Sequence, residues 1–348
     1  MSTTTPTPTP RGVSRRSFLA RAATGATAAL LAVGLAACGS SEPSPAPGAG
    51  SSGGAAEPLV LGFAQVGAES GWRTANTKSI QDAAAAAGVD LKFSDAQQKQ
   101  ENQIKAIRSF VQQRVDVIAF SPVVTTGWDT VLQEAKRANI PVILTDRAID
   151  TPDPTLYKTF LGSDFIEEGK KAGDWLVQQY QGNSAPVAIV QLEGTTGSAP
   201  AIDRTKGFAD AIAANPNMKV VATQTGDFTR SGGKQVMEAF LKSQPQIDVV
   251  YAQNDDMGLG AIEAIQAAGK VPGQDIKIIT VDAVKDGMQA LADGKINYIV
   301  ECNPLLGEQL MDLAKKVKAG EEVPNRVVTV ETAFDQAAAQ KALPERKY

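Results

Sequence analysis

Strand-like and helix-like segments alternate along most of this chain, and that alternation restricts the folds it can adopt. Short apolar runs rich in β-branched residues are each followed by a longer amphipathic run. We expect strands at 59–66, 89–94, 115–120, 140–145, 157–162, 187–192, 218–224, 247–252, 276–281 and 296–301. We expect helices near 72–87, 100–113, 126–138, 165–180, 199–214, 230–243, 256–268, 284–293 and 305–319. Repeated strand–helix units predict α/β architecture with parallel sheets and helices on both faces.

Two of these strands end in the same way. The run 140–145 stops on Asp146, with Arg147 beside it, and the run 276–281 stops on Asp282. Alone, Asp146 and Arg147 could equally form a capped turn and a surface pair. Ligands of open α/β sheets, however, bind beyond the carboxyl ends of the strands. Two similar lobes, each presenting an aspartate at such an end, therefore predict a site shared between the lobes.

Composition excludes several kinds of enzyme. The chain has 348 residues, 43% of them hydrophobic, which is enough for two domains with cores of their own. It contains no histidine. Ser-His-Asp and Cys-His nucleophilic sites, histidine-dependent zinc sites and histidine acid–base chemistry are therefore absent.

The first part of the chain has the pattern of an export signal. A twin-arginine motif at 14–19 precedes an Ala/Leu-rich run at 22–37, which is short for a membrane span, and Leu-Ala-Ala leads directly into Cys38. This end resembles the lipobox of bacterial lipoproteins. We expect 1–37 to be a twin-arginine lipoprotein signal peptide and 38–57, rich in Gly, Ser and Pro, to be a lipidated Cys38 followed by a flexible tether.

Net charge and cysteine content limit the partners and the disulfide bonds that this chain can be expected to have. The formal net charge of −4 becomes −8 once the four arginines of the expected signal, Arg11, Arg15, Arg16 and Arg21, are removed. An acidic exported body argues against nucleic acid as a partner. With Cys38 lipidated, only Cys302 remains, so we expect no disulfide within the chain.

Polar and aromatic side chains follow the strands of both lobes. Carboxylates and Asn accept hydrogen bonds from hydroxyls, Arg donates in a rigid fork, and an aromatic face can cover the apolar side of a sugar ring. These types suit a neutral polyol, although an amino acid with its two charged ends would also fit. The residues in these positions include Ser70, Trp72, Arg73, Asp146, Arg147, Arg204, Phe228, Asn254, Asp282 and Asn303.

Two of these positions need a choice between interpretations. A lone Trp at the start of a helix is often core, but Gly71 and Arg73 flank Trp72 and favour an exposed ring. Asp282, like Asp146, is expected near arginines, which would hold both carboxylates ionised.

The sequence contains no complete catalytic or phosphate-binding motif. The sequence contains no phosphate-binding P-loop, no full G-x-G-x-x-G and no G-x-S-x-G elbow. Ionised carboxylates do not suit the general acid of a glycosidase. The pair Asp255–Asp256 is expected to cap a helix rather than to bind a metal, because no calcium-loop spacing surrounds it. We therefore expect neither an enzyme, a cofactor nor a metal site.

From about residue 58 to 332 the chain resembles the type I periplasmic sugar-binding proteins of ABC transporters. The stretches that carry the resemblance are GFAQVGAESGWR, DAQQKQENQIKAIRSF, SPVVTTGW, PVILTDR, GSAPAIDRTKGF, GDFTRS, YAQNDDM and TVDAV. The resemblance implies two doubly wound parallel-sheet lobes joined by a three-crossover hinge, with crossovers near Leu161, Asn303 and Thr332. The implied lobes are 58–161 plus 304–332, and 162–303 plus 333–348.

The resemblance also implies a ligand and partners. The ten residues named above would surround one monosaccharide, which hinge closure encloses and which an ABC permease with its ATPase receives. Members of the family that bind galactofuranose are the most similar, so galactofuranose or a close aldose is implied. Ribose-binding members have two adjacent aromatics where this chain has Trp72 and Arg73, which argues against ribose. The expected protein is a monomer, lipid-anchored on the outer face of the cell membrane.

Two other classes of protein stay open at this point, a receptor for a different small molecule and an enzyme. The ligand could be another pentose or hexose, a signalling furanose or an amino acid. More remotely, the chain could be an exported carbohydrate-active enzyme.

Overall fold

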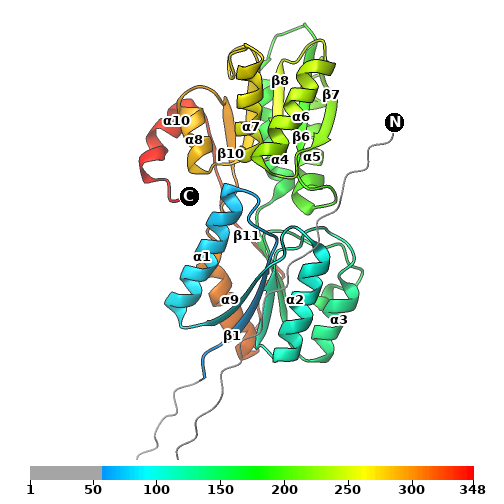
Figure 1. Ribbon diagram of the computed structural model, residues 1–348, viewed down its shortest axis with the longest axis vertical. Helices are drawn as coiled ribbons and strands as arrows, with labels where there is room; N and C mark the ends of the chain where they lie inside the picture. The colour runs from blue at the N-terminus through cyan, green and yellow to red at the C-terminus, as the bar shows by residue number, and fades with distance from the viewer. Residues whose placement is uncertain (1–56) are drawn as a thin grey trace, which may run out of the picture. The chain divides into compact units, whose positions relative to one another are not determined.

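The computed structural model describes residues 57–348, and within them it contains two six-stranded sheets (Figure 1). The predicted signal peptide, Cys38 and the predicted tether up to residue 56 lie outside the described residues. In residues 57–348 no helix is both long enough and apolar enough to cross a membrane.

The first sheet has the strand order β11-β5-β4-β3-β1-β2, with every neighbouring pair parallel. Its strands are β1 (Val60–Gln65), β2 (Asp90–Asp95), β3 (Val117–Phe120), β4 (Val142–Thr145), β5 (Thr159–Gly162) and β11 (Arg326–Val328). Around it lie α1 (Gly71–Ala87), α2 (Gln100–Gln113), α3 (Asp129–Arg137), the 3-10 turn η1 (Pro154–Leu156) and α9 (Gly307–Ala319). We call this unit the N-lobe.

The second sheet repeats the same order, β12-β10-β9-β8-β6-β7. Its strands are β6 (Val187–Glu193), β7 (Met218–Thr225), β8 (Val249–Ala252), β9 (Lys277–Asp282), β10 (Tyr298–Glu301) and β12 (Ala333–Phe334). Its helices are α4 (Phe165–Gln179), α5 (Ala199–Ile212), α6 (Arg230–Ser243), α7 (Asp255–Ala267), α8 (Lys285–Ala292), α10 (Gln336–Ala342) and the 3-10 turn η2 (Leu343–Glu345). We call this unit the C-lobe.

Each sheet is covered on both faces, so its central strands are apolar throughout. In the N-lobe, α1 and α9 pack on one face around Leu61 and Phe63, and α2 and α3 pack on the other around Ile118 and Phe120 (Figure 1). In the C-lobe, α6, α7 and α8 cover one face and α4 and α5 the other. Polar ligands are therefore confined to the ends of the strands.

The chain passes between the two sheets three times, in segments 163–164, 302–306 and 329–332. The segments contact one another: Ser163 Oγ lies 3.3 Å from Cys302 Sγ and 3.3 Å from Thr329 Oγ1. The residues after β12 remain in the C-lobe. There Arg346 donates from Nε to the carbonyl of Ala283 at 2.6 Å and from Nη1 to Glu301 at 2.8 Å.

The fold-class prediction of two α/β lobes joined by three crossovers is confirmed, and each predicted strand and helix has a counterpart. The sequence patterns did not predict β11, β12, α10 or the two 3-10 turns. Each of these has at most seven residues, too few to display a periodicity. One pair departs from the parallel arrangement, because β12 runs antiparallel to β10.

Candidate functional site

The two strand-end aspartates occupy matching and conformationally unusual positions. Asp146 follows β4 with φ of 61°, and Asp282 ends β9 with φ of 122°. Positive φ is costly for a residue with a side chain, and such residues concentrate at functional sites. Close packing maintains the Asp146 turn: a Cβ on Gly162 would lie 2.8 Å from the carbonyl oxygen of Asp146. Only glycine therefore fits at position 162.

In the N-lobe, Arg73 holds Asp146 in place. Its Nη2 donates to Asp146 Oδ2 at 2.7 Å, and its Nε donates to Glu69 Oε1 at 3.0 Å. Ser121 Oγ donates to the same Asp146 oxygen at 2.9 Å. Burial opposes the charge of Arg73, but Asp146 and Glu69 raise its pKa above the ordinary value. Around Asp146 this half of the site is a connected network of buried polar groups, in which Glu69 Oε2 is left without a hydrogen-bond partner among the described residues.

Arg147 is buried beside that network but has few partners. Its Nη1 donates to the carbonyl of Val123 at 3.2 Å, and the guanidinium lies 5.3 Å from the ring centre of Phe228 in the C-lobe. Its Nε has no hydrogen-bond partner among the described residues. Burial, followed by the charge of Arg73, lowers the pKa of Arg147 to about 10. A buried donor without an acceptor is costly, so a ligand oxygen at this position would be stabilised.

In the C-lobe, Arg204 is held away from the aspartate. Its Nε donates to Glu168 Oε2 at 2.7 Å and its Nη1 to the carbonyl of Gln253 at 2.6 Å. The Asp282 carboxylate is 3.9 Å from Arg204 Nη2, too far for a hydrogen bond. Burial raises the pKa of Asp282 well above its usual range, and Arg204 offsets this only in part. The prediction that an arginine holds Asp282 ionised is therefore wrong.

Trp72 connects the lobes. Its ring is 4% exposed and packs in the C-lobe cluster that contains Phe165, Val284 and Val300. Its Nε1 donates to the carbonyl of Cys302 in the second crossover at 2.7 Å. The interpretation of Trp72 as an exposed ring is wrong, because the C-lobe covers it.

Other predicted residues both shape the backbone and face the site. Ser70 caps α1 by accepting from the backbone N–H of Arg73 at 3.1 Å. Asn254 caps α7, accepting from Met257 N–H, and its Nδ2 donates to the carbonyl of Phe228. Asn254 is thus the N-cap, whereas Asp255 and Asp256, expected to cap, occupy the first turn. Phe228 fits closely because a Cβ on Gly194 would lie 1.8 Å from its ring.

These side chains enclose one cavity at the carboxyl ends of both sheets. Nine of the ten predicted site residues line it, together with three residues that were not predicted. Its lining is Glu69, Ser70, Trp72, Arg73, Asp146, Arg147, Pro200, Arg204, Phe228, Asn254, Asp282 and Cys302. The predicted residue outside this lining is Asn303, whose Oδ1 accepts from the N–H of Leu305 at 2.9 Å.

The three unpredicted lining residues are adjacent to features that the sequence did offer. Glu69 directly precedes Ser70, and Cys302 directly precedes the predicted crossover residue Asn303. Pro200 lies in the first turn of α5, in the stretch GSAPAIDRTKGF. A larger hollow of about 860 Å³ lies at the amino ends of β4 and β5, but the lysines and glutamates that line it are exposed. It lacks the buried polar groups that would orient a ligand.

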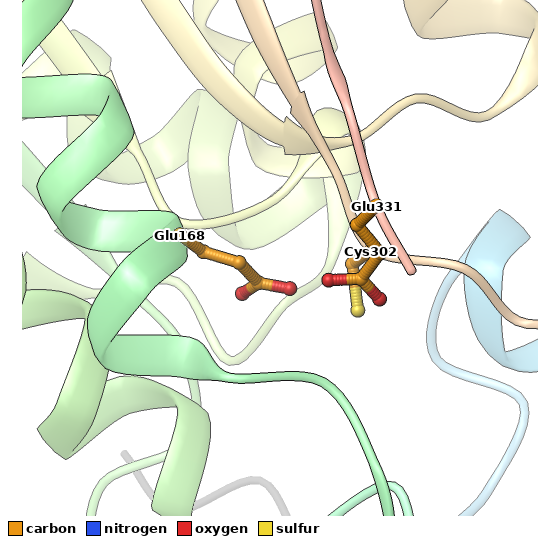
Figure 2. Close-up of side chains that lie close together, drawn as sticks. All are labelled: Glu168, Cys302 and Glu331. Atoms are coloured by element: carbon orange, nitrogen blue, oxygen red, sulfur yellow. The ribbon is translucent and has the colours of Figure 1, made fainter. Parts of the chain in front are cut away.

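A second polar cluster lies where the crossovers meet. Figure 2 shows Glu168, on α4, pointing toward Cys302 and Glu331, which come from the second and third crossovers; their carboxylate oxygens and thiol sulfur lie within 4.8 Å of one another. Glu331 Oε1 already accepts hydrogen bonds from Asn303 N–H, Thr329 Oγ1 and Ser163 Oγ. The lone pairs of Glu331 Oε1 are thus occupied, and the hydrogen bonds of this cluster connect the three crossovers.

Burial governs the ionisation of this hinge cluster. Burial raises the pKa of Glu168 to about 8, although Arg204 opposes the change. Glu168 Oε1 has no hydrogen-bond partner in the described part of the chain. Burial also raises the pKa of the Cys302 thiol well above its usual range. Because the thiolate is the nucleophilic form, burial disfavours reaction at Cys302.

A two-lobed α/β fold with a polar, buried site between the lobes defines a class, the extracytoplasmic solute-binding proteins. The chain belongs to the family described as periplasmic binding protein domain, whose profile matches residues 61–322. The predicted family resemblance is thereby confirmed. So is the prediction of a binding protein rather than an enzyme, since family and relatives are solute-binding proteins.

Individual relatives are similar over most of their length. The chain is 49% identical over 296 residues to the galactofuranose-binding protein YtfQ of Escherichia coli (strain K12), covering 84% of this chain and 92% of that protein. A crystal structure from Mycobacterium smegmatis in complex with β-D-fucofuranose is 74% identical, with a TM-score of 0.83 over 83% of this chain and 95% of that one. A second structure from M. smegmatis, described without a ligand, is 72% identical, with a TM-score of 0.65 over 84% and 95%.

Proposed function

We propose that this chain is an exported receptor that binds one aldofuranose of the galactofuranose type between its lobes. The observation that carries the proposal is the shared cavity, where a buried Arg147 donor lacks an acceptor and faces contributions from both lobes. A sugar contacting both lobes favours the form in which they are together, because a ligand shifts an equilibrium by its differential affinity. Closure and reopening of the hinge would then capture and release the sugar.

The nine predicted residues that line the cavity, and Asn303 beside it, each have a role in this proposal. Arg147 donates to a ring or hydroxyl oxygen, and Asp146 and Asp282 accept from hydroxyls on opposite sides of the sugar. Phe228 and Trp72 cover apolar C–H faces. The remaining proposed contacts are those of Ser70, Arg73, Arg204, Asn254 and, from the hinge, Asn303.

The relatives support the choice of sugar. One is named for galactofuranose and another was solved with β-D-fucofuranose. D-fucose is D-galactose without the hydroxyl of its terminal carbon, so both share the ring that the cavity would recognise. We propose that the furanose ring and its hydroxyls determine binding, and that the terminal hydroxyl is of secondary importance.

The two M. smegmatis structures support closure as the mechanism. At nearly equal identity, the sugar complex superposes on this chain with a TM-score of 0.83 and the other structure with 0.65. We interpret the conformation of this chain as the closed one. Contacts across the lobes, such as Trp72 Nε1 to the Cys302 carbonyl in the hinge and Arg147 near Phe228, fit that interpretation.

Export, anchoring and delivery belong to the same proposal. Residues 1–37 would direct twin-arginine export, Cys38 would carry lipid, and 38–57 would tether the lobes, 58–161 plus 304–332 and 162–303 plus 333–348. The closed form would dock, as a monomer, on an ABC permease with its ATPase. Replacing Cys38 with Ala should release the protein from the membrane fraction, and retention of that variant would contradict the lipid anchor.

Calorimetric titration with sugars locked as methyl furanosides or methyl pyranosides tests the ligand. We expect methyl β-D-galactofuranoside to bind one-to-one and the corresponding pyranoside not to bind. Free D-galactose, which contains little furanose, should give an apparent stoichiometry in total sugar far above one. One-to-one binding of ribose, glucose or an amino acid would replace the ligand and keep the closure mechanism.

A further inference from the structure

Asp256 connects the two lobes without lining the ligand cavity. It lies in the first turn of α7 in the C-lobe and is 8% exposed. Its Oδ2 accepts a hydrogen bond of 2.7 Å from the backbone N–H of Gly71, the first residue of α1 in the N-lobe. Its Oδ1 lies 3.4 Å from Nε of Arg230, a C-lobe residue. One carboxylate thus bonds across the cleft with one oxygen and remains paired within its own lobe with the other.

The amino end of α1 is suited to receive this carboxylate. The first N–H groups of a helix lack partners within it, and the helix dipole favours negative charge there. Ser70 satisfies the N–H of Arg73, and the first turn of α1 contains no acidic residue of its own. The C-lobe therefore supplies the acid that this helix end lacks.

The bond is partly buried, because Asp256 is buried whereas Gly71 is exposed. The two lobes approach closely here: a Cβ built on Gly71 would lie 3.5 Å from Asp256 Oδ2 and 3.8 Å from a methyl group of Val284, another C-lobe residue. Hydrogen bonds to carboxylate acceptors are stronger than bonds between neutral groups. Because Gly71 and Asp256 belong to different lobes, the bond can form only when the lobes are together.

We propose that Asp256 is a closure latch, a positioning residue that stabilises the closed state by capping α1 and so raises sugar affinity without touching the sugar. The inference rests on the proposed function, since the latch acts on the closure that the sugar drives. A contact present only in the closed state reduces the free energy that the ligand must supply for closing. The effect should be seen mainly in dissociation, because the latch forms after the sugar enters.

The test compares Asp256→Asn with a matched control in the full chain. The control is Asp286→Asn, because Asp286 also pairs with Arg230, at 3.0 Å, but forms no hydrogen bond or ion pair with the described residues of the N-lobe. Binding of methyl β-D-galactofuranoside is followed by calorimetry and its release by stopped-flow fluorescence. We expect Asp256→Asn to weaken binding about tenfold, or about 1.4 kcal/mol, and to speed release by a similar factor. Asp286→Asn should match the wild type, and the melting temperatures without sugar should agree.

A second variant approaches the same bond from the other lobe. Gly71→Pro removes the donor N–H at the first helical position, which proline tolerates. It should reproduce the faster release of Asp256→Asn. Unchanged affinity and release in both variants would overturn the latch. The latch would also be overturned if Asp256→Asn weakened binding and lowered the thermal stability of the sugar-free protein to the same extent. That result would show that Asp256 only stabilises α7.

Failure of the latch can be separated from failure of the proposed function. If the wild type binds none of the furanosides, the proposed function fails. The latch is then judged by hydrogen–deuterium exchange of the Gly71 amide in the sugar-free chain. Faster exchange in Asp256→Asn than in the wild type supports the latch, and equal exchange overturns it.

Discussion

Asp146 and Asp282 occupy equivalent positions in two lobes of the same strand order, yet their surroundings differ. Asp146 accepts short hydrogen bonds from Arg73 and Ser121, whereas Asp282 has only Arg204 at 3.9 Å and a raised pKa. The aspartate of the N-lobe half is therefore organised by protein donors, whereas no side-chain donor holds Asp282 among the described residues. In the N-lobe half it is Arg147 Nε that is left for the ligand to satisfy. Duplicated topology has placed the same residue type in two different electrostatic roles.

The largest effect should follow from breaking the organised half. Asp146→Ala leaves buried Arg73 with Glu69 as its remaining acid partner, and it removes an acceptor for the sugar. We expect a loss of about 2–4 kcal/mol in binding, the range for an unpaired buried polar group near a charge. Calorimetry checks this, and an unchanged affinity would contradict the role of Asp146.

The buried carboxyl group of Glu168, in the C-lobe, should make the stability of the protein depend on pH. The pKa of Glu168 is raised to about 8, so the folded protein keeps a proton that the unfolded chain loses near its ordinary value of 4.5. Stability is then complete below that ordinary value and falls as pH rises toward 8. Between those two values, the free energy of unfolding should fall by up to about 1.4 kcal/mol per pH unit on account of this carboxyl.

The matched variant for this prediction is Glu168→Gln, which has nothing to titrate. Urea unfolding of both proteins at several values between pH 5 and 8 should show a smaller decline in the variant. Burial also raises the pKa of Asp255, whose contribution to the pH dependence is the same in both proteins and cancels in the difference. The pKa of Asp282 is raised by burial and also by the charge of Glu168, so its contribution decreases together with that of Glu168 in the variant. If the plots of unfolding free energy against pH were parallel for the two proteins, Glu168 would not keep an extra proton in the folded state.

A smaller effect is expected where the lobes meet. Trp72→Phe keeps a ring in the C-lobe cluster and removes the Nε1 bond to the Cys302 carbonyl. The loss should be about 1 kcal/mol, typical of one hydrogen bond. It should appear in the affinity for sugar and in the melting temperature of the complex. An affinity equal to that of the wild type would separate Trp72 from closure.

The smallest effect is expected at Asp282. Asp282 accepts no hydrogen bond from Arg204, so Asp282→Asn breaks no charged hydrogen bond within the protein, and binding near pH 7 should weaken by less than about 1 kcal/mol. The same change at Asp146 should cost clearly more, because Arg73 requires the charge. Equal losses in the two asparagine variants, measured by calorimetry in one buffer, would remove the contrast between the halves.

Local patterns predicted much of this molecule. Buried strands are recognisable from apolar runs, and the residues after their carboxyl ends, such as Asp146 in the N-lobe and Phe228 in the C-lobe, necessarily lie at the carboxyl edge of their own sheet. Contacts that depend on three-dimensional distance were not predictable. The burial of Trp72 depends on a lobe formed more than ninety positions later, by residues such as Phe165 and Val300. The raised pKa of Asp282 depends on its burial, which Arg204, 3.9 Å away, offsets only in part.

The position of Trp72 gives the protein an optical reporter of its own. Of the three tryptophans, Trp128 is buried in the N-lobe and Trp175 stacks on Tyr298 within the C-lobe. Trp72 alone belongs to one lobe while its indole is surrounded by the other. Opening would bring water to that indole and shift its emission to longer wavelength. The fluorescence of the unlabelled protein should therefore record each opening and closing event in real time.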